Sequence, residues 1–238
     1  RNISRLTVGP ILLTSANHAG EPDCQDGQSV VDCLGDQVDL VLDQGETRYG
    51  QASTVVKIID NDYQILREGV FGDATVKRMC SFMALFVCTG NTCRSPMAEL
   101  LMKQQLAEKL GVEIDQLEEK GIQVASAGVA AMPGAKASHE SIEAMKKMGL
   151  DLSQHESQPV SDRLLEYSDV ILTMTNGHRQ ALVSHWPEIA DRTKIICADG
   201  SDIADPIGGP LSLYESCAKQ IDHQIKEWVD QIELGIPE

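Results

Sequence analysis

The sequence predicts an α/β protein with a four-stranded parallel sheet covered by helices on both faces. From residue 83 onward, short apolar segments alternate with segments whose apolar residues recur every three or four positions. This alternation is typical of buried parallel strands separated by amphipathic helices. The chain has 238 residues, of which 42% are apolar and 24% charged. That composition is ordinary for a soluble protein with a real core, in one large domain or two small ones.

The elements of residues 83–238 follow from this periodicity. We expect strands at 83–88, 122–128, 169–174 and 194–198. We expect helices at 96–110, 138–148, 161–167 and 177–186, and a last helix from about Leu211. The last helix has one apolar face with spacings of three and four, formed by Tyr214, Cys217, Ile221, Ile225, Trp228 and Ile232.

Residues 1–70 predict a different, strand-rich segment of partial α/β type. The expected strands are 9–17, 38–43, 53–59 and 63–69, and the polar stretch 20–36 could be partly helical. A segment of this size buries too little surface to be stable alone, which favours an incomplete domain. Residue 1 is Arg rather than Met, so we expect the chain to be cut at its N-terminus. Residues 71–82 form the expected linker.

Charge and composition exclude several classes of protein. The formal net charge is −16, which argues against nucleic acid as a partner, and the 4% aromatic content weakens any prediction of base stacking. No apolar run approaches the roughly 18 residues of a membrane span, and no signal peptide is visible. The seven cysteines are scattered, unlike a disulfide framework, so we expect a reducing cytoplasm.

The segment Cys88-Thr-Gly-Asn-Thr-Cys-Arg-Ser95 has the features of an anion-binding loop. Successive backbone N–H groups that lead into a helix N-terminus form a concave site for an oxyanion. Gly90 and Asn91 tolerate the left-handed backbone that such a loop needs. Ser95 suits the N-cap and Pro96 the first helical position. Arg94 can hold two phosphate oxygens with its planar fork, and a thiol at Cys88 should ionise there.

Three other interpretations of this loop are weaker. A nucleotide-binding phosphate loop would end in Gly-Lys-Ser/Thr, which is missing. A zinc site needs further ligands, and Cys88 and Cys93 have no Cys/His set nearby, so we expect no metal. A buried inert cysteine would not explain why Asn91, Arg94 and Ser95 occur together.

The segment "FVCTGNTCRSPMAE" resembles the signature of the low-molecular-weight protein-tyrosine-phosphatase family, and the similarity runs from Met83 to the end. The segments "VASAGV" (124–129) and "ADPIGG" (204–209) match its Ser-Ala-Gly and Asp-Pro segments. The resemblance implies a four-stranded parallel sheet and catalysis without a cofactor. It implies that Cys88 is the nucleophile, Arg94 the phosphate clamp and Asp205 the general acid and base. The implied phosphate-binding residues are Thr89, Gly90, Asn91, Thr92, Cys93 and Ser95.

One further role carries over from the family: Ser126 is the expected hydrogen-bond partner of Asn91 and supports the loop. Cys93 either protects Cys88 by a reversible disulfide or is a buried packing residue. Pro206 favours an extended backbone at Asp205, which suits a carboxyl held over a pocket and partly protonated near neutral pH.

The resemblance implies a phosphorylated protein or a small phosphomonoester as the substrate, and two positions bear on which phosphorylated group it carries. Many family members have aromatic residues after Asp-Pro, whereas Ile207-Gly208-Gly209 stands here, which weakens stacking on phosphotyrosine. Thr92 stands where many family members have Ile, and in this respect the loop is most similar to that of the bacterial protein-arginine phosphatase branch. That branch usually has Phe where Ile207 stands here. A hydroxyl at this position could orient water or a guanidinium, so phosphotyrosine and phosphoarginine both stay open. Arsenate reduction needs a relay of further cysteines. No cysteine lies between Cys93 and Cys197, which disfavours this activity, although Cys197 and Cys217 stay open as relay residues.

The segments "LLTSANHAGEPD" (12–23), "VDLVLDQGETRYGQASTVVKI" (38–58) and "ILREGVF" (65–71) resemble the C-terminal part of the YrdC-like threonylcarbamoyl-AMP synthase family, which acts in tRNA modification. By this resemblance Ser15, Asn17 and Arg67 would face ATP and Ser53 would face threonine. The family's upstream Lys and Arg are missing, so we expect no adenylate synthesis here. ATP and threonine would bind only if the domain were complete.

Three hypotheses therefore compete. The first is a cysteine-dependent phosphatase fused to a partial YrdC-like segment. The second is a synthase for which the phosphatase part is a fused partner. The third is a phospho-residue binding module without turnover.

Overall fold

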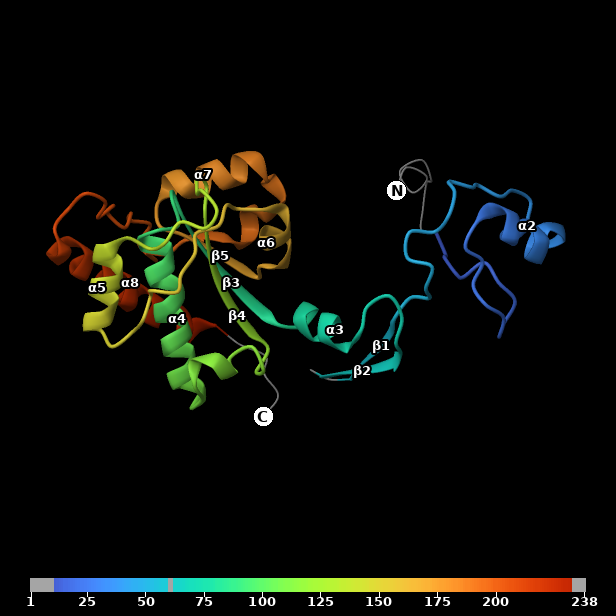
Figure 1. The fold of residues 1–238 in the computed structure, drawn as a ribbon, viewed down its shortest axis with the longest axis horizontal. Coiled ribbons are helices and arrows are strands. Elements are labelled where there is room, and N and C mark those ends of the chain that lie inside the picture. Colours follow the sequence, from blue (N-terminus) through green and yellow to red (C-terminus); the bar gives the residue numbers. More distant parts are fainter. Residues whose placement is uncertain (1–10, 60–61, 233–238) are drawn as a thin grey trace. The chain divides into compact units, whose positions relative to one another are not determined.

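The computed structural model describes residues 11–59 and 62–232. The chain divides into two compact units, Arg1–Val76 and Lys77–Glu238. Helix α3 (Asp73–Met79) crosses this division (Figure 1). Each unit is described by itself.

The second unit is built on a four-stranded parallel sheet in the order β4-β3-β5-β6. The strands are β3 (Phe82–Cys88), β4 (Ile122–Gly128), β5 (Val170–Thr173) and β6 (Thr193–Ile195). Between them lie α4 (Arg94–Leu110), η2 (Ile114–Gln116), α5 (His139–Lys147), α6 (Asp162–Tyr167), α7 (Asn176–His185) and η3 (Pro187–Arg192). Helix α8 (Leu211–Gln231) ends the described chain.

Helices cover both faces of this sheet (Figure 1). Side chains of β3 alternate between two apolar clusters, because successive strand residues point to opposite faces. Ala84 and Phe86 pack in the cluster that contains residues of α4, α5 and α8. Leu85 and Val87 pack in the cluster that contains residues of α6, α7 and η3. The predicted α/β sheet with helices on both faces is therefore confirmed.

The helices begin where short polar side chains cap them. Ser138, Ser161 and Thr175 each accept a hydrogen bond from the backbone N–H three residues later, at the starts of α5, α6 and α7. Helix α4 ends at Gly111, whose φ of 65° is the left-handed conformation of a C-terminal cap. These caps explain why the observed bounds lie within a residue or two of the predicted ones.

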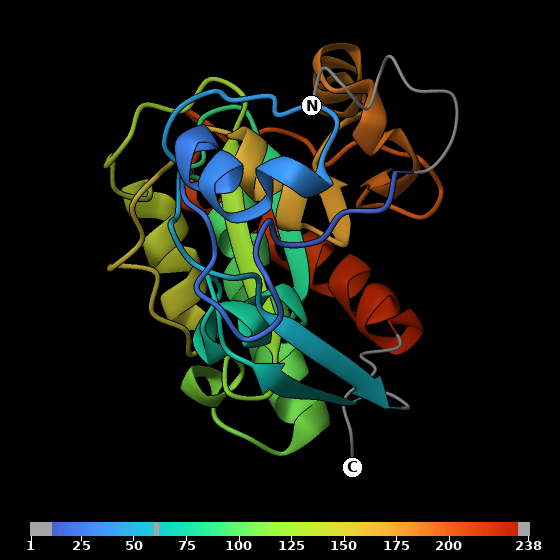
Figure 2. The same ribbon diagram turned by 90° about the vertical axis from the view of Figure 1, so that its right-hand side faces the viewer.

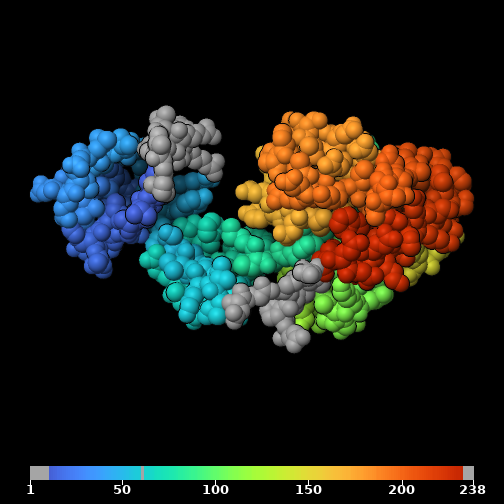
Figure 3. Space-filling view, turned by 180° about the vertical axis from the view of Figure 1, so that it is seen from behind, coloured from blue at the N-terminus to red at the C-terminus, as the bar shows by residue number. Residues whose placement is uncertain are grey.

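Helix α8 buries the predicted apolar face and leaves the opposite face at the surface, drawn in red in Figure 3. Tyr214, Cys217, Ile221 and Ile225 are buried, and Trp228 is half-buried with its indole N–H donating to the Ile196 carbonyl at 2.8 Å. Ile232 packs against the same cluster. Among the described residues, no helix has the length and apolarity that a bilayer span requires.

The first unit contains α2 (Gly27–Leu34), η1 (Gly35–Gln37) and an antiparallel pair of strands, β1 (Val55–Ile59) and β2 (Asp62–Arg67) (Figure 2, teal). Asp26 caps α2 by accepting the Ser29 backbone N–H at 2.7 Å. Within residues 11–59 and 62–76 only Val76 is buried. This unit therefore has very little core of its own.

Several predictions for the front of the chain were wrong. Residues 38–43 form no strand, and neither do residues 11–17; residues 9 and 10 lie outside the described chain. Leu40 and Leu42 are 73% and 66% exposed, so their alternating pattern meets no partner strand in the described residues. The strands expected at 53–59 and 63–69 are present as β1 and β2. The segment predicted as a linker, 71–82, contains α3 and the first residue of β3.

Candidate active site

The candidate site lies at the carboxyl end of β3, where parallel α/β sheets bind their ligands. Cys88 is the last residue of β3 and Arg94 the first of α4, so residues 89–93 form the connecting loop. Strands β4 and β5 flank β3. The sheet therefore holds the two ends of the loop, and the helix presents its N-terminus to whatever the loop binds.

Hydrogen-bond donors surround the sulfur of Cys88. The backbone N–H of Asn91 donates to Sγ at 3.2 Å, and the Ser95 hydroxyl lies 3.0 Å from Sγ. Ser95 Oγ accepts from Asn91 Nδ2 at 3.0 Å, so its own hydrogen points either to Sγ or to the Ala127 carbonyl, at 3.4 Å. The loop and the first turn of α4 therefore surround the sulfur with polar partners.

Asn91 fixes the shape of the loop. It is fully buried and has a φ of 54°, the left-handed conformation expected for it. Its amide nitrogen donates to Ser126 Oγ at 2.8 Å, which is the expected hydrogen bond, and to Ser95. Its amide oxygen accepts the backbone N–H of Gln158 at 2.8 Å. One buried side chain thus ties the loop to α4, to β4 and to the segment that precedes α6.

Besides Gln158, three further members of this network were not predicted from the sequence: Glu99, Lys103 and His155. Ser126 donates its hydroxyl hydrogen to Glu99 Oε2 at 2.7 Å, and Glu99 also pairs with Lys103 at 2.5 Å. His155 Nε2 lies 2.8 Å from the Asn91 carbonyl oxygen and must donate to it. Glu99 could have been found, because it lies one helical turn after Ser95. His155 has no local sequence signal.

The predicted cap of α4 was wrong. The helix begins at Arg94, and its N-cap is Cys93, without a side-chain hydrogen bond. Ser95 is the second helical residue, and its hydroxyl is used for Cys88 and Asn91 instead. Pro96 is the third residue, still in the first turn, where a missing backbone N–H leaves no helical hydrogen bond unmade.

Arg94 joins the loop to the segment that carries Asp205. One guanidinium nitrogen donates to the Ile203 carbonyl at 3.0 Å, and another pairs with the Asp205 carboxylate. The Arg94 side chain is 5% exposed and that of Asp205 is 41% exposed. Asp205 Oδ1 also accepts the backbone N–H of Ile207 at 3.2 Å. The expected clamp and the expected acid are therefore direct neighbours, the clamp buried and the acid at the surface.

A second histidine, also unpredicted, contacts the loop from α7. His178 Nε2 lies 2.9 Å from Thr89 Oγ1, and its Nδ1 lies 2.9 Å from Thr175 Oγ1. His178 is only 8% exposed. Burial lowers the pKa of His178 below its ordinary value, and the nearby Arg94 guanidinium lowers it further, against the opposing effect of Asp205 and Asp202. The imidazole is therefore neutral near pH 7.

Cys93 is a buried packing residue in this structure. It packs with Ala144, Tyr214 and Leu211, and its Sγ lies 3.4 Å from Ser138 Oγ. Cys88 and Cys93 are both free thiols, so the reversible disulfide stays a prediction. Burial raises the pKa of Cys217, on α8, to about 12, which keeps that third thiol neutral.

Around the loop, Gly90, Thr92 and Gly128 complete the site. The Thr92 carbonyl accepts the Ser138 backbone N–H at 2.9 Å, and its half-buried side chain faces the Gly90 side of the loop. A Cβ on Gly128 would lie 2.5 Å from the Thr89 carbonyl oxygen, so only glycine allows β4 to approach the loop this closely. Among the described residues, no group of three His, Cys, Asp or Glu side chains could hold a metal ion.

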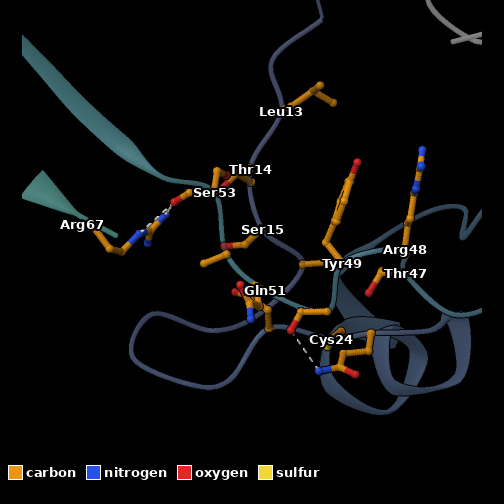
Figure 4. Close-up of a pocket in the computed structure, with 15 residues that line it drawn as sticks. Leu13, Thr14, Ser15, Cys24, Thr47, Arg48, Tyr49, Gln51, Ser53 and Arg67 are labelled. Carbon is orange, nitrogen blue, oxygen red and sulfur yellow. Dashed lines mark hydrogen bonds between the residues drawn. The ribbon is translucent and has the colours of Figure 1, made fainter. Parts of the chain in front are cut away.

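The first unit has a separate cavity of about 590 Å³ that holds three of its four predicted residues (Figure 4). Ser15, Ser53 and Arg67 line it, and the Arg67 guanidinium donates to the Ser53 carbonyl at 3.0 and 3.3 Å. Asn17 does not line it; its amide donates to the Glu21 carbonyl at 2.6 Å. The structure thus brings Ser15, Ser53 and Arg67 together and leaves Asn17 out.

Comparison with known proteins identifies the family of the second unit. A family model described as low molecular weight phosphotyrosine protein phosphatase matches residues 83–235. This chain belongs to that family. A protein-arginine-phosphatase of Bacillus subtilis is 34% identical over 152 residues, which are 62% of this chain and 95% of the relative.

Solved structures agree with this membership. A low molecular weight protein tyrosine phosphatase from T. tengcongensis is 36% identical with a TM-score of 0.57, and the match covers 64% of this chain and all of that one. A YwlE mutant from Bacillus subtilis is 32% identical with a TM-score of 0.56, over 63% of this chain and 98% of that one. A second family model, of the Sua5/YciO/YrdC type and described as telomere recombination, matches residues 1–69. Both expected resemblances are therefore confirmed.

Proposed function

We propose that residues 83–238 hydrolyse phosphorylated protein side chains in two steps, and that phosphoarginine is the substrate class. The single observation that carries the activity is the cradle around Cys88, where the Asn91 backbone N–H donates to the sulfur at 3.2 Å and the Ser95 hydroxyl lies 3.0 Å from it, beside a buried arginine. A thiolate in that field can attack phosphorus while main-chain N–H groups and Arg94 hold the phosphoryl oxygens.

Each step balances with residues of this site. In the first, Cys88 Sγ forms a bond to phosphorus, the bond from phosphorus to the leaving nitrogen or oxygen breaks, and Asp205 gives its proton to the leaving group. In the second, Asp205 takes a proton from water, the water oxygen bonds to phosphorus, and the Cys88 thiolate leaves. The Asp205 carboxyl is placed for both steps because it lies beside the buried Arg94 and is itself 41% exposed. Neither step calls for a metal or a cofactor, so EDTA should leave the activity intact.

Thr92 and the residues after Asp205 support phosphoarginine over phosphotyrosine. Ile207 is 70% exposed and is followed by two glycines, so this rim offers no aromatic ring to stack on a phenol. Thr92 offers a hydroxyl to the polar guanidinium. The protein-arginine-phosphatases of Bacillus subtilis and Geobacillus stearothermophilus are 34% and 33% identical to this chain. A solved YwlE arginine phosphatase, in which a serine replaces a cysteine, has a phosphorylated active-site serine. A phosphorylated enzyme intermediate at Cys88 would agree with that structure.

The test compares phosphate release from two peptides of one sequence, which carry either phosphoarginine or phosphotyrosine. We expect the wild-type protein to prefer phosphoarginine, Cys88→Ser to abolish release from both, and Thr92→Ile to shift the preference toward phosphotyrosine. Cys80→Ser is the matched control, because Cys80 is exposed and lies before β3, whereas the loop follows the other end of that strand. A wild-type preference for phosphotyrosine would contradict the substrate class and leave the cysteine mechanism standing. Turnover by Cys88→Ser would contradict the mechanism itself.

A second proposal concerns the first unit. The cavity that gathers Ser15, Ser53 and Arg67, in a segment matched by the Sua5/YciO/YrdC model, supports a partial threonylcarbamoyl-AMP synthase site. Because residues 1–238 do not include the family's upstream Lys and Arg, we expect this stretch by itself to release no pyrophosphate from ATP with threonine and bicarbonate. Pyrophosphate release above the level of a Ser53→Ala, Arg67→Ala double variant would overturn this.

A further inference from the structure

Thr89 is the one residue of the loop 89–93 whose side chain is exposed; Gly90 and Thr92 are half-buried, and Asn91 and Cys93 are buried. It follows Cys88 directly, and its backbone is fixed because its carbonyl accepts the Ala130 N–H at 2.9 Å. Its side chain is fixed as well, by His178 at 2.9 Å. A buried histidine therefore holds the hydroxyl of an exposed threonine directly beside the nucleophile.

The hydrogen atoms of this group can be placed from the contacts. Thr175 Oγ1 accepts the His178 backbone N–H at 3.2 Å as the cap of α7, so its own hydrogen is available for His178 Nδ1, at 2.9 Å. We assign the proton of the neutral imidazole to Nε2, because this assignment gives the Thr175 hydroxyl hydrogen an acceptor at Nδ1. Nε2–H donates to Thr89 Oγ1, which keeps one lone pair and its own hydrogen. Among the described residues, no other side chain or carbonyl hydrogen bonds with that hydroxyl.

The position of α7 explains why this histidine reaches the site. Strand β5 pairs with β3, and the Met174 N–H donates to the Val87 carbonyl at 3.0 Å, one residue before Cys88. Helix α7 starts two residues later, so its first turn stands beside the loop. Arg94, Asp205 and Asp202 are the charged groups that act on the imidazole. Because burial and Arg94 keep it neutral, the hydrogen-bond pattern just described holds at neutral pH.

We propose that the Thr89 hydroxyl is a specificity-determining contact to the leaving group of the substrate, and that His178 is the positioning residue that orients it. This inference rests on the proposed function. In the proposed reaction backbone N–H groups and Arg94 hold the phosphoryl group, so the exposed side chain at the edge of the loop would meet the part of the substrate outside the cradle. The hydroxyl accepts a guanidinium N–H through its free lone pair and donates to a phosphoryl oxygen. A phenyl ester has no N–H at that place, so it uses only half of this contact.

The test is the ratio of kcat/KM for a phosphoarginine peptide to kcat/KM for p-nitrophenyl phosphate. Thr89→Val keeps the shape and removes the hydroxyl, and should lower this ratio about fivefold to tenfold, the effect of one hydrogen bond. His178→Leu should lower it similarly, and His178→Gln, which keeps an N–H donor, should restore most of it. The double variant Thr89→Val, His178→Leu should be no worse than Thr89→Val, because both changes remove one interaction. His223→Leu, on the exposed side of α8, is the matched control.

Each outcome decides between defined alternatives. An unchanged ratio in Thr89→Val, or additive losses in the double variant, would overturn the inference. The proposed function would still hold in that case, provided that the wild-type protein hydrolyses phosphoarginine. A wild-type protein that hydrolyses p-nitrophenyl phosphate and not phosphoarginine would overturn the inference together with the proposed substrate class, and would leave the cysteine mechanism standing. If His178→Leu did not fold, the ratios of Thr89→Val and His178→Gln would decide alone. A lower ratio in Thr89→Val with a near-normal ratio in His178→Gln would support the inference. Equal losses in the two variants would show that the N–H of His178 does not position Thr89.

Discussion

Replacing Asn91 should destabilise the second unit by an amount that the structure allows us to divide into two parts. The side chain makes three hydrogen bonds, to Ser95 at 3.0 Å, to Ser126 at 2.8 Å and from Gln158 at 2.8 Å, and it is fully buried. At about 1 kcal/mol each, these bonds contribute about 3 kcal/mol. An alanine at a φ of 54° adds about 1 kcal/mol of backbone strain, which glycine does not.

We therefore expect the free energy of unfolding to fall by about 3 kcal/mol in Asn91→Gly and about 4 kcal/mol in Asn91→Ala. Urea unfolding can be followed by the fluorescence of Trp186 and Trp228, the two tryptophans of the chain, which both lie in the second unit. Asn176→Ala is the matched control, because Asn176 is exposed and its loss should cost less than about 0.5 kcal/mol.

The same two variants also test how much the hydrogen bonds of Asn91 contribute to catalysis at Cys88. Asn91 also orients the Ser95 hydroxyl that faces the sulfur, so kcat for p-nitrophenyl phosphate should fall at least about tenfold in both. A loss of stability below about 1 kcal/mol in Asn91→Gly would refute the reasoning, because it would mean that the three bonds contribute nothing beyond what water supplies. A glycine variant less stable than the alanine variant would refute the strain argument.

Three further predictions concern the charged and titrating groups. Arg94→Lys removes the fork that reaches Ile203 and Asp205, so steady-state kcat/KM should fall on the order of 10² to 10³-fold, and a loss under about tenfold would contradict the clamp. Cys217 is buried with a pKa raised to about 12, so peptide mapping after iodoacetate at pH 6 should find Cys217 unlabelled in the folded protein, and labelling of Cys217 would contradict its burial. Burial lowers the pKa of His178 from its ordinary value of 6.5, so the unfolded chain binds a proton at a higher pH than the folded protein does. The free energy of unfolding should therefore be largest above pH 6.5 and decrease as the pH falls below it. In His178→Gln the free energy of unfolding should depend less on pH in that range.

The sequence was sufficient for the loop because its chemistry is local. A nucleophile, a residue for the left-handed turn, a clamp and a helix start lie within eight consecutive positions, and a helix that follows a buried strand must present its N-terminus there. His155 and His178 reach the same loop from 64 and 89 residues away. Their place depends on which strand pairs with β3, and no spacing in the sequence states that pairing. The cap failed for a related reason: Ser95 has the right residue type for an N-cap, but the sulfur of Cys88 uses its hydroxyl.

The front of the chain shows where such reasoning ends. Alternating apolar residues at 38–43 give the capacity for a strand, but a strand also needs a neighbour that accepts its ladder of hydrogen bonds. In the described residues β1 and β2 pair only with each other, and all five residues of β1 are exposed. Leu40 and Leu42, also exposed, lie in irregular backbone for the same reason. A hydrophobic pattern therefore predicts the face that a segment would bury, and the partner decides whether the strand forms.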